Sequence, residues 1–282
     1  MHPVELRFSA PFVDAHVHTR EGNALDCAAA AGVTAVRDAG ARVNTEGVVQ
    51  AQKVRANGPL VVSSGWALYK KGGYGSLFGV SVETREEIKS EIFKLKGAGA
   101  GIIKIIASGM VSLKQPDTIT PGGFDGGEIE FIVEEAGGLG LSVMAHANGE
   151  AAIMAAAAAN VRSIEHGFFM TEHALDMMAK KKIYWTPTVG ALARAAEASS
   201  VSPETRKFIS DRIRKHVKMI QHAYSIGVPL AVGTDCVLPD PEYRKIYDAE
   251  LSYFERAGIS RQDVLRIACE GGATLLGLSN IL

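Results

Sequence analysis

Four of the eight histidines and one aspartate stand at the ends of short apolar runs: His16, His18, His146, His166 and Asp235. His16 and His18 form an HxH pair. Residues i and i+2 of a strand point to the same side, so both imidazoles can reach one ion. Imidazoles with a carboxylate suit a borderline divalent ion such as zinc. The pattern predicts a metal site.

Each of these signals also has a simpler structural explanation when it is taken alone. An isolated HxH in a strand is commonly structural, the histidine of EHG can be a polar strand end, and Asp235 in GTD could cap a helix. These explanations give no reason for all five residues to fall at the same end of alternating elements. The shared placement therefore favours the metal site.

Short apolar runs and longer amphipathic stretches alternate along the chain. A nearly continuous apolar run rich in β-branched residues is typical of a strand buried on both faces. Eight such runs are predicted as strands: Phe12–His18, Val33–Asp38, Leu60–Trp66, Ile102–Ser108, Ser142–Ala147, Ser163–His166, Ile183–Val189 and Pro229–Thr234. The candidate ligands fall at the carboxyl ends of the first, fifth, sixth and eighth runs.

The stretches between these runs fit helices. Residues 84–96 place apolar side chains on one face and charges opposite, and Thr84 with Glu87 resembles a capping box. Residues 203–226 carry a second apolar stripe, and the alanine-rich run 151–159 fits a crossover helix. Glycines of the kind that end helices precede four of the strands: Gly32, Gly99, Gly140 and Gly227.

Strands that alternate with helices imply parallel βαβ units with right-handed crossovers. Eight units favour a TIM-type (β/α)8 barrel, which takes roughly 250 residues. A doubly wound sheet would want GxGxxG after the first strand, where HVHTREGN stands instead. We expect one barrel domain over residues 1–282, with 1–11 as a lead-in and 239–282 as a closing loop and helices. Its strands then open on one face, where such barrels place active sites.

Composition narrows the class of protein further. The formal charge is −1, which gives no sign of a nucleic-acid or anionic-membrane partner. No apolar stretch approaches the ~20 residues of a membrane span, and the residues at the start of the sequence lead us to expect no secretory signal. Cys27, Cys236 and Cys269 form no paired motif. We expect a cytoplasmic protein that acts on a small molecule, with homo-oligomerisation left open.

Lys104 interrupts the otherwise apolar run GIIKIIASG, the fourth predicted strand. An isolated ammonium in a barrel interior would be very unfavourable. Either the pKa of Lys104 falls or the side chain gains a partner. A neutral or ion-paired lysine beside a single ion is the simpler alternative to a lysine that takes part in a second metal site.

The motifs FVDAHVH, MAHANG, SIEHG and VGTD together resemble the successive metal motifs of the amidohydrolase superfamily. AGVTAVRDAG and IIKIIASG make the imidazolonepropionase-like and prolidase-like branch the more similar one. The resemblance extends from Phe12 to Leu278. It implies two divalent ions, zinc first with manganese, iron and cobalt as alternatives, and carboxylation of Lys104 by carbon dioxide to a bridging carbamate.

The resemblance also implies a division of labour. His16, His18 and Asp235 would bind the more buried ion, whereas His146 and His166 would bind the more exposed one. A hydroxide that bridges the ions, formed because bound metal lowers the pKa of water to near 7, would attack an amide, peptide or cyclic amide. Asp235 would act as general base and then as general acid.

Six residues near strand ends are candidate substrate contacts: Arg20, Tyr69, Tyr74, Ser108, Asn148 and Thr188. Arg20 resembles the HxHxR arginine that grips a substrate carboxylate in cyclic-amide hydrolases such as dihydroorotases, and an ion pair at the rim is the alternative. The two tyrosines flank the glycine-containing loop KKGGYGS. Three further histidines are expected on the surface: His173, His216 and His222.

Most relatives on this branch have a β-rich segment before the HxH strand, completed after the barrel. Here the metal motif starts at His16 and the chain ends at Leu282, so we expect no accessory β-sandwich, either in a natural barrel-only form or in a fragment. We also expect a short loop over Cys236–Tyr243. The rival functions are lactone or phosphotriester cleavage, heterocycle deamination and a non-catalytic binding barrel. Lys104 argues against the deaminases, which usually use one metal and no bridging lysine.

Overall fold

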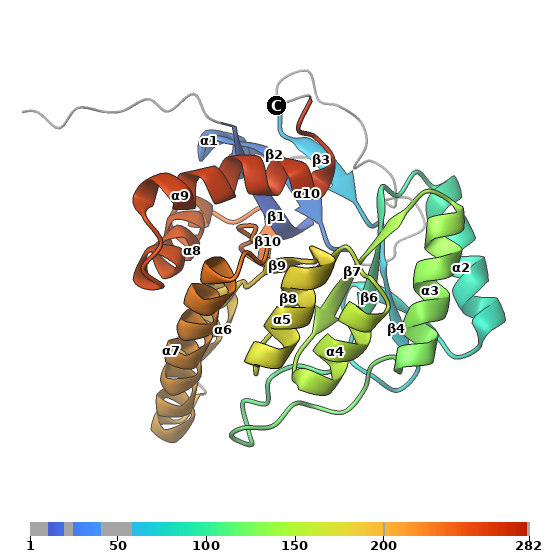
Figure 1. Ribbon diagram of the computed structural model, residues 1–282, viewed down its shortest axis with the longest axis horizontal. Helices are drawn as coiled ribbons and strands as arrows, with labels where there is room; N and C mark the ends of the chain where they lie inside the picture. The colour runs from blue at the N-terminus through green and yellow to red at the C-terminus, as the bar shows by residue number, and fades with distance from the viewer. Residues whose placement is uncertain (1–10, 20–24, 41–57, 200, 281–282) are drawn as a thin grey trace, which may run out of the picture.

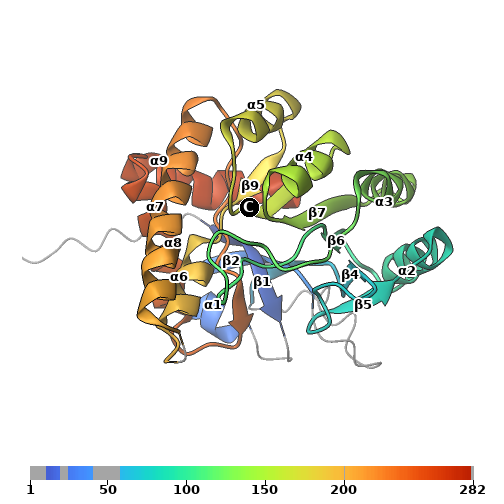
Figure 2. The same ribbon diagram turned by 90° about the horizontal axis from the view of Figure 1, so that it is seen from below.

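The computed structural model describes residues 11–19, 25–40, 58–199 and 201–280. In these residues parallel strands form the interior and helices surround them, as in a TIM-type β/α barrel. The helices within residues 85–181 (α2 to α5) lie outside one part of the strands, and those within residues 203–266 (α7, α8 and α9) cover the opposite side (Figures 1 and 2). None of the described helices combines the length and the apolar character that a bilayer crossing requires.

The described strands are short and follow one another in the order expected for alternating units. They are β1 (Phe12–Thr19), β2 (Val33–Asp38), β3 (Leu60–Ser63), β4 (Ala67–Lys70), β5 (Gly79–Val82), β6 (Ile102–Ile106), β7 (Ser142–Ala147), β8 (Ser163–His166), β9 (Tyr184–Thr186) and β10 (Cys236–Leu238). They form two parallel sheets, with the orders β10-β1-β2-β3 and β5-β4-β6-β7-β8-β9.

The helices are α1 (Asp26–Ala30), α2 (Arg85–Gly97), α3 (Gly126–Gly138), α4 (Glu150–Ala158), α5 (Glu172–Lys181), α6 (Val189–Glu197), α7 (Pro203–Ser225), α8 (Tyr243–Arg256), α9 (Arg261–Arg266) and α10 (Gly272–Leu276), with a π-helical turn at Ile267–Gly271. The predicted helices at 84–96 and 203–226 are confirmed as α2 and α7. The capping box of α2 is also confirmed, because the Thr84 hydroxyl accepts the Glu87 N–H and the Glu87 carboxylate accepts the Thr84 N–H.

The predicted eighth strand, Pro229–Thr234, occupies its expected place but is not a regular strand. The Trp185 N–H donates to the Pro229 carbonyl at 2.9 Å, and the Ala15 N–H donates to the Val232 carbonyl at 2.8 Å, so this segment lies between β9 and β1. The chain then turns at Asp235, whose φ is 52°. It resumes as β10 beside the end of β1, where a loop was expected.

The predicted third strand, Leu60–Trp66, is divided into β3 and β4. The Ser63 hydroxyl accepts the Gly65 N–H at 2.9 Å and donates to Asp38 at 2.9 Å, which bends the chain after Ser63. Gly65 has a φ of 71°, a conformation that suits glycine. The Gly101 N–H donates to the Ser63 carbonyl and so links this region to the start of β6.

His216 corrects the prediction of a surface histidine. It lies on α7 with only 2% of its surface exposed, between the rings of Phe168 and Trp185 at 4.6 and 5.1 Å. Its spacing from Ile213 and Ile220 puts it on the apolar face of the helix, a signal present in the sequence. His173, by contrast, is exposed as expected.

Candidate metal centre

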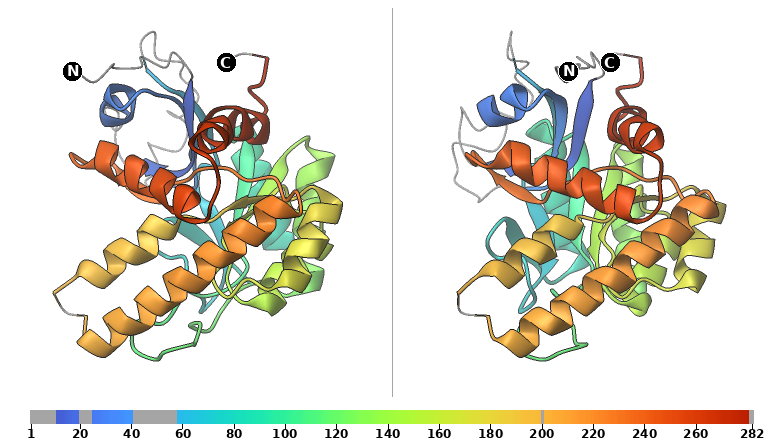
Figure 3. Two further views of the ribbon diagram at one scale, coloured as in Figure 1. Left: turned by 60° about the vertical axis from the view of Figure 1, so that its left-hand side comes forward. Right: turned by 90° about the vertical axis from the view of Figure 1, so that its left-hand side faces the viewer.

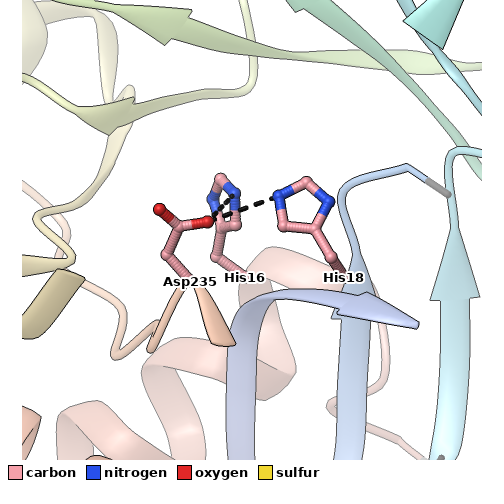
Figure 4. A group of neighbouring side chains, drawn as sticks. All are labelled: His16, His18 and Asp235. Carbon is pink, nitrogen blue, oxygen red and sulfur yellow. Dashed lines mark ion pairs between the residues drawn. The ribbon is translucent and has the colours of Figure 1, made fainter. Parts of the chain in front are cut away.

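His16 and His18 converge on Asp235 at the carboxyl ends of the strands. The Asp235 Oδ1 atom lies 3.5 Å from His16 Nε2 and 3.3 Å from His18 Nε2 (Figure 4). One ligand atom from each residue falls within 4.8 Å of the others. The Asp235 N–H donates to the His16 carbonyl at 2.8 Å, which fixes the aspartate beside β1. These three side chains could bind one ion without rearrangement of the backbone.

His146, at the end of β7, and His166, at the end of β8, face the same space. Their ring centroids are 4.5 Å apart, and the centroid of His166 is 5.0 Å from that of His16. His166 Nδ1 lies 3.9 Å from Asp235 Oδ2. The structure therefore brings all four histidines and Asp235 together.

In each of these histidines one ring nitrogen already contacts a protein atom. Nδ1 of His16 is 2.7 Å from a Glu165 oxygen, Nδ1 of His18 is 2.7 Å from the Gly40 carbonyl, Nε2 of His146 is 3.1 Å from the Gly109 carbonyl, and Nδ1 of His166 is 2.7 Å from the Thr188 hydroxyl. Such outer partners fix the tautomer and orientation of metal-binding histidines. In His16 and His18 the opposite nitrogen, Nε2, faces Asp235 and is placed to bind an ion.

Lys104 lies on β6 and is buried among these groups, with 1% of its surface exposed. Its Nζ atom and His16 Nε2 are among the few buried side-chain atoms of the described residues that lack a hydrogen-bond partner. Unpaired buried polar atoms are uncommon in native proteins and point to a missing ion or water. The two unpaired atoms beside Asp235 therefore fit a metal centre.

Burial also sets the protonation states that a metal centre needs. It lowers the pKa of His16 to about 4 and that of His146 to about 3, with a further contribution from the Lys104 charge, and it lowers the pKa of His166 well below its ordinary value. The rings are neutral at pH 7, as metal ligands must be. Burial likewise lowers the pKa of Lys104 to about 8, against the attraction of Glu165 and Asp235.

Arg37 and Glu165 form a fully buried ion pair that orients the His16 ring. Arg37 donates to Glu165 Oε1 at 2.8 Å, while Glu165 Oε2 accepts His16 Nδ1 at 2.7 Å. Burial favours the neutral acid, but Arg37 and His16 hold the pKa of Glu165 at about 2. Sequence reasoning missed this pair, although charged residues in buried strands are the same signal as Lys104.

Asp14 is a second support that sequence reasoning missed. Its carboxylate accepts the backbone N–H groups of His16 and Thr234 at 3.1 and 3.0 Å. It also accepts the hydroxyls of Thr234 and Tyr243 at 2.6 and 2.8 Å. Asp14 thus joins β1 to the segment that ends at Asp235 and sets the separation of the ligands on the two elements.

Five of the six predicted substrate contacts lie within the described residues, and they fall into three groups. Tyr74 stands at the rim, with its ring 5.3 Å from that of His146 and 5.5 Å from that of Phe78. Tyr69 packs against the turn at Gly75 and Gly79. Ser108, Asn148 and Thr188 are buried, and their side-chain polar atoms hydrogen-bond to other groups of the protein. These bonds favour a supporting role over direct contact with substrate. Arg20 lies outside the described residues.

Comparisons with known proteins place the chain among hydrolases of the same fold. Ochratoxinase of Aspergillus niger is 27% identical over 247 residues, which are 78% of this chain and 50% of that protein, so the chain spans about half the length of this curated relative. A prolidase complexed with N-methylphosphonate-L-proline superposes with a TM-score of 0.80 at 26% identity, over 97% of this chain and 76% of the other.

A Xaa-Pro dipeptidase with bound methionine in the active site has the same fold, with a TM-score of 0.78 at 22% identity over 96% of this chain and 76% of that one. A sequence model described as the amidohydrolase family matches residues 9–281. That match takes in every strand, every helix and every candidate ligand described above. The chain belongs to the amidohydrolase family.

Proposed function

We propose that this chain is a hydrolase of amide, peptide or cyclic-amide bonds that works with two divalent metal ions. The proposed ligands are His16, His18, Lys104, His146, His166 and Asp235. One observation supports the proposal most strongly. His16 and His18 are each held through Nδ1 and present Nε2 to Asp235. His146 and His166 face the same space, and His16 Nε2 and Lys104 Nζ lack hydrogen-bond partners within the described residues. The prolidase with a similar fold favours dipeptides as the first substrates to test.

Bound ions would supply Lewis acidity that polarises the scissile carbonyl and activates water. We propose zinc, with manganese, iron and cobalt as alternatives. Asp235 accepts the proton of the attacking water at a carboxylate oxygen and then delivers it to the leaving nitrogen. Burial alone would raise the pKa of Asp235, but His18, His16 and His166 keep it well below its ordinary value. The side chain is therefore ionised at pH 7 and able to accept a proton.

Lys104 is proposed to be carboxylated. Its lowered pKa, about 8, leaves a fraction of neutral amine at pH 7. The neutral Nζ forms a bond to the carbon of carbon dioxide and loses one proton, which leaves an anionic carbamate. The change removes a buried cation that has no hydrogen-bond partner in the described structure and adds two oxygen ligands.

We further propose one barrel domain that acts on a small molecule in the cytoplasm. The described strands and the segment that ends at Asp235 supply the whole set of proposed ligands, which supports a single catalytic unit. The aromatic rim formed by Tyr74 and Phe78 next to His146 and His18 gives a substrate an apolar surface beside the ions.

The test is a substrate screen with protein loaded with Zn²⁺ or Mn²⁺. The panel contains dipeptides, N-acyl amino acids, cyclic amides, lactones, phosphotriesters and amino-substituted heterocycles. We expect the strongest turnover on an amide, with Asp235→Asn nearly inactive and the surface variant Asp248→Asn unchanged. Turnover confined to lactones, phosphotriesters or heterocycles, or full activity of Asp235→Asn, would contradict the proposal.

A further inference from the structure

Three residues that border the centre have left-handed backbone conformations. The φ angles are 65° at His166, 47° at Thr188 and 52° at Asp235. These conformations are disfavoured in residues other than glycine, and most of all in a β-branched residue such as Thr188. Such strain persists only where surrounding structure enforces it, and it clusters at functional sites.

Helix α6 begins immediately after Thr188 and is held by a buried carboxylate. The N–H groups of Val189 and Gly190 donate to the two oxygens of Glu250 at 2.9 and 2.7 Å. Glu250 lies on α8 and is fully buried. Because Glu250 binds the free N–H groups at the start of the helix, the Thr188 hydroxyl does not cap it and instead faces His166 Nδ1 at 2.7 Å.

The same short helix also reaches the backbone of the aspartate. Arg194 Nη2 donates to the carbonyls of Thr234 and Asp235 at 3.0 and 3.5 Å. A Cβ atom at Gly190 would lie 3.1 Å from a Glu250 oxygen and 3.2 Å from Arg194 Nη1, so glycine leaves room for both side chains. Figure 3 shows α6 lying along α7, which supports it from outside.

We propose that Glu250, helix α6 and Arg194 form a clamp that positions two metal ligands, His166 through the Thr188 hydroxyl and Asp235 through its carbonyl. The inference rests on the proposed function, since it concerns the geometry of the metal centre. Glu250, Thr188 and Arg194 are positioning residues that need not touch substrate. The clamp holds one proposed ligand of each ion. Its loss should therefore weaken metal binding directly and slow turnover only as a consequence.

The electrostatics of Glu250 support a positional role. Burial raises the pKa of Glu250 to about 7, although the Gly190 and Val189 N–H groups and Arg194 favour its charge. An ionisable group in so apolar a place lowers the stability of the fold. A carboxylate offers two acceptor oxygens, so Glu250 can bind the two neighbouring N–H groups with one oxygen each, whereas an amide offers only one.

The clamp is tested on the full chain with metal titration. Metal-free Glu250→Gln and Thr188→Val proteins are titrated with Co²⁺, and both the affinities and the cobalt absorption spectrum are recorded. We expect at least one site to bind about 10- to 100-fold more weakly and the spectrum to change. Thr188→Ser keeps the hydroxyl and should restore the affinity that Thr188→Val loses.

Glu87→Gln is the matched control, because Glu87 also accepts two backbone N–H groups at the start of a helix, on α2 away from the centre. It should lower thermal stability without changing metal affinity. If Glu250→Gln fails to fold, the variants Thr188→Val, Thr188→Ser and Arg194→Met test the clamp in its place. Wild-type affinities and spectra in the folded variants would overturn the clamp alone, whereas failure of the unchanged protein to bind cobalt would overturn the proposed function and the clamp together.

Discussion

The two halves of the candidate metal centre are supported by different chemistry. Behind His16 stands a buried charged network, in which Arg37 donates to Glu165 and Glu165 accepts the His16 ring N–H. Behind His146 and His166 stand neutral groups, the Gly109 carbonyl and the Thr188 hydroxyl. Both halves have buried imidazoles, yet of these three rings only that of His16 contacts a buried charged side chain directly in the described structure.

This difference predicts two degrees of pre-organisation. A buried ion pair with several hydrogen bonds fixes its neighbours strongly, and removal of one member leaves an unpaired charge. A neutral hydrogen bond contributes about 1 kcal/mol and is easily replaced. The charged half should therefore be ready to bind its ion in the metal-free protein, whereas the neutral half depends on backbone conformations enforced by α6.

The largest expected effect comes from breaking the charged network. Glu165→Leu leaves Arg37 buried without its partner and should lower the free energy of unfolding by about 3–5 kcal/mol. The double variant Arg37→Met with Glu165→Leu should recover much of that loss. Urea denaturation of the metal-free proteins measures both. The distinction between the halves would be wrong if Glu165→Leu were as stable as the parent, or if the double variant were no more stable than Glu165→Leu.

We propose that Lys104 joins the two halves, so that its removal should separate them. Lys104→Met deletes a buried cation that lacks a hydrogen-bond partner in the described structure, so the metal-free protein should stay folded. Metal content should fall from about two ions per chain to about one, because the proposed bridging ligand is lost. Elemental analysis beside the exposed control Lys89→Met measures this. Two retained ions would show that Lys104 is not a ligand.

Acid should lower the stability of the neutral half through His216. This ring packs beside Trp185, and the Trp185 indole N–H donates a hydrogen bond to the His166 carbonyl at 3.0 Å. Burial lowers the pKa of His216 from 6.5 to about 4. Between these values the unfolded chain binds more protons, so stability falls as pH falls. Between pH 7 and pH 5.5, His216→Gln should lose about 1 kcal/mol less unfolding free energy than the parent does, both in the metal-free form. Unchanged pH dependence, equal to that of His222→Gln, would contradict this.

The smallest effect is expected at Asn148. Its Nδ2 donates to the Gly109 carbonyl at 3.1 Å, the same carbonyl that His146 contacts. Asn148→Ala should cost about 1 kcal/mol of stability and weaken one metal site by about tenfold. Denaturation and zinc titration measure the two changes. A loss as large as that of Glu165→Leu would show that both halves depend equally on their supports.

The sequence predicted the barrel and the convergence of the histidines because these depend on local periodicity and on parallel strands ending together. Lys104 was expected inside, because its neighbours along the strand are apolar, and it is buried. The supports were not predicted, since Arg37 and Glu165 are 128 residues apart in sequence and no local pattern pairs them. The irregular segment before Asp235 reflects its left-handed backbone, which propensity does not encode.

Metal content tests most directly whether the six proposed ligands of one barrel face hold two ions. The metal-free chain is reconstituted with Zn²⁺ and bicarbonate, freed of excess ion and analysed for zinc per chain. We expect about two zinc ions, reduced to about one by Lys104→Met. At most one ion in the unchanged protein would contradict the proposal of two ions.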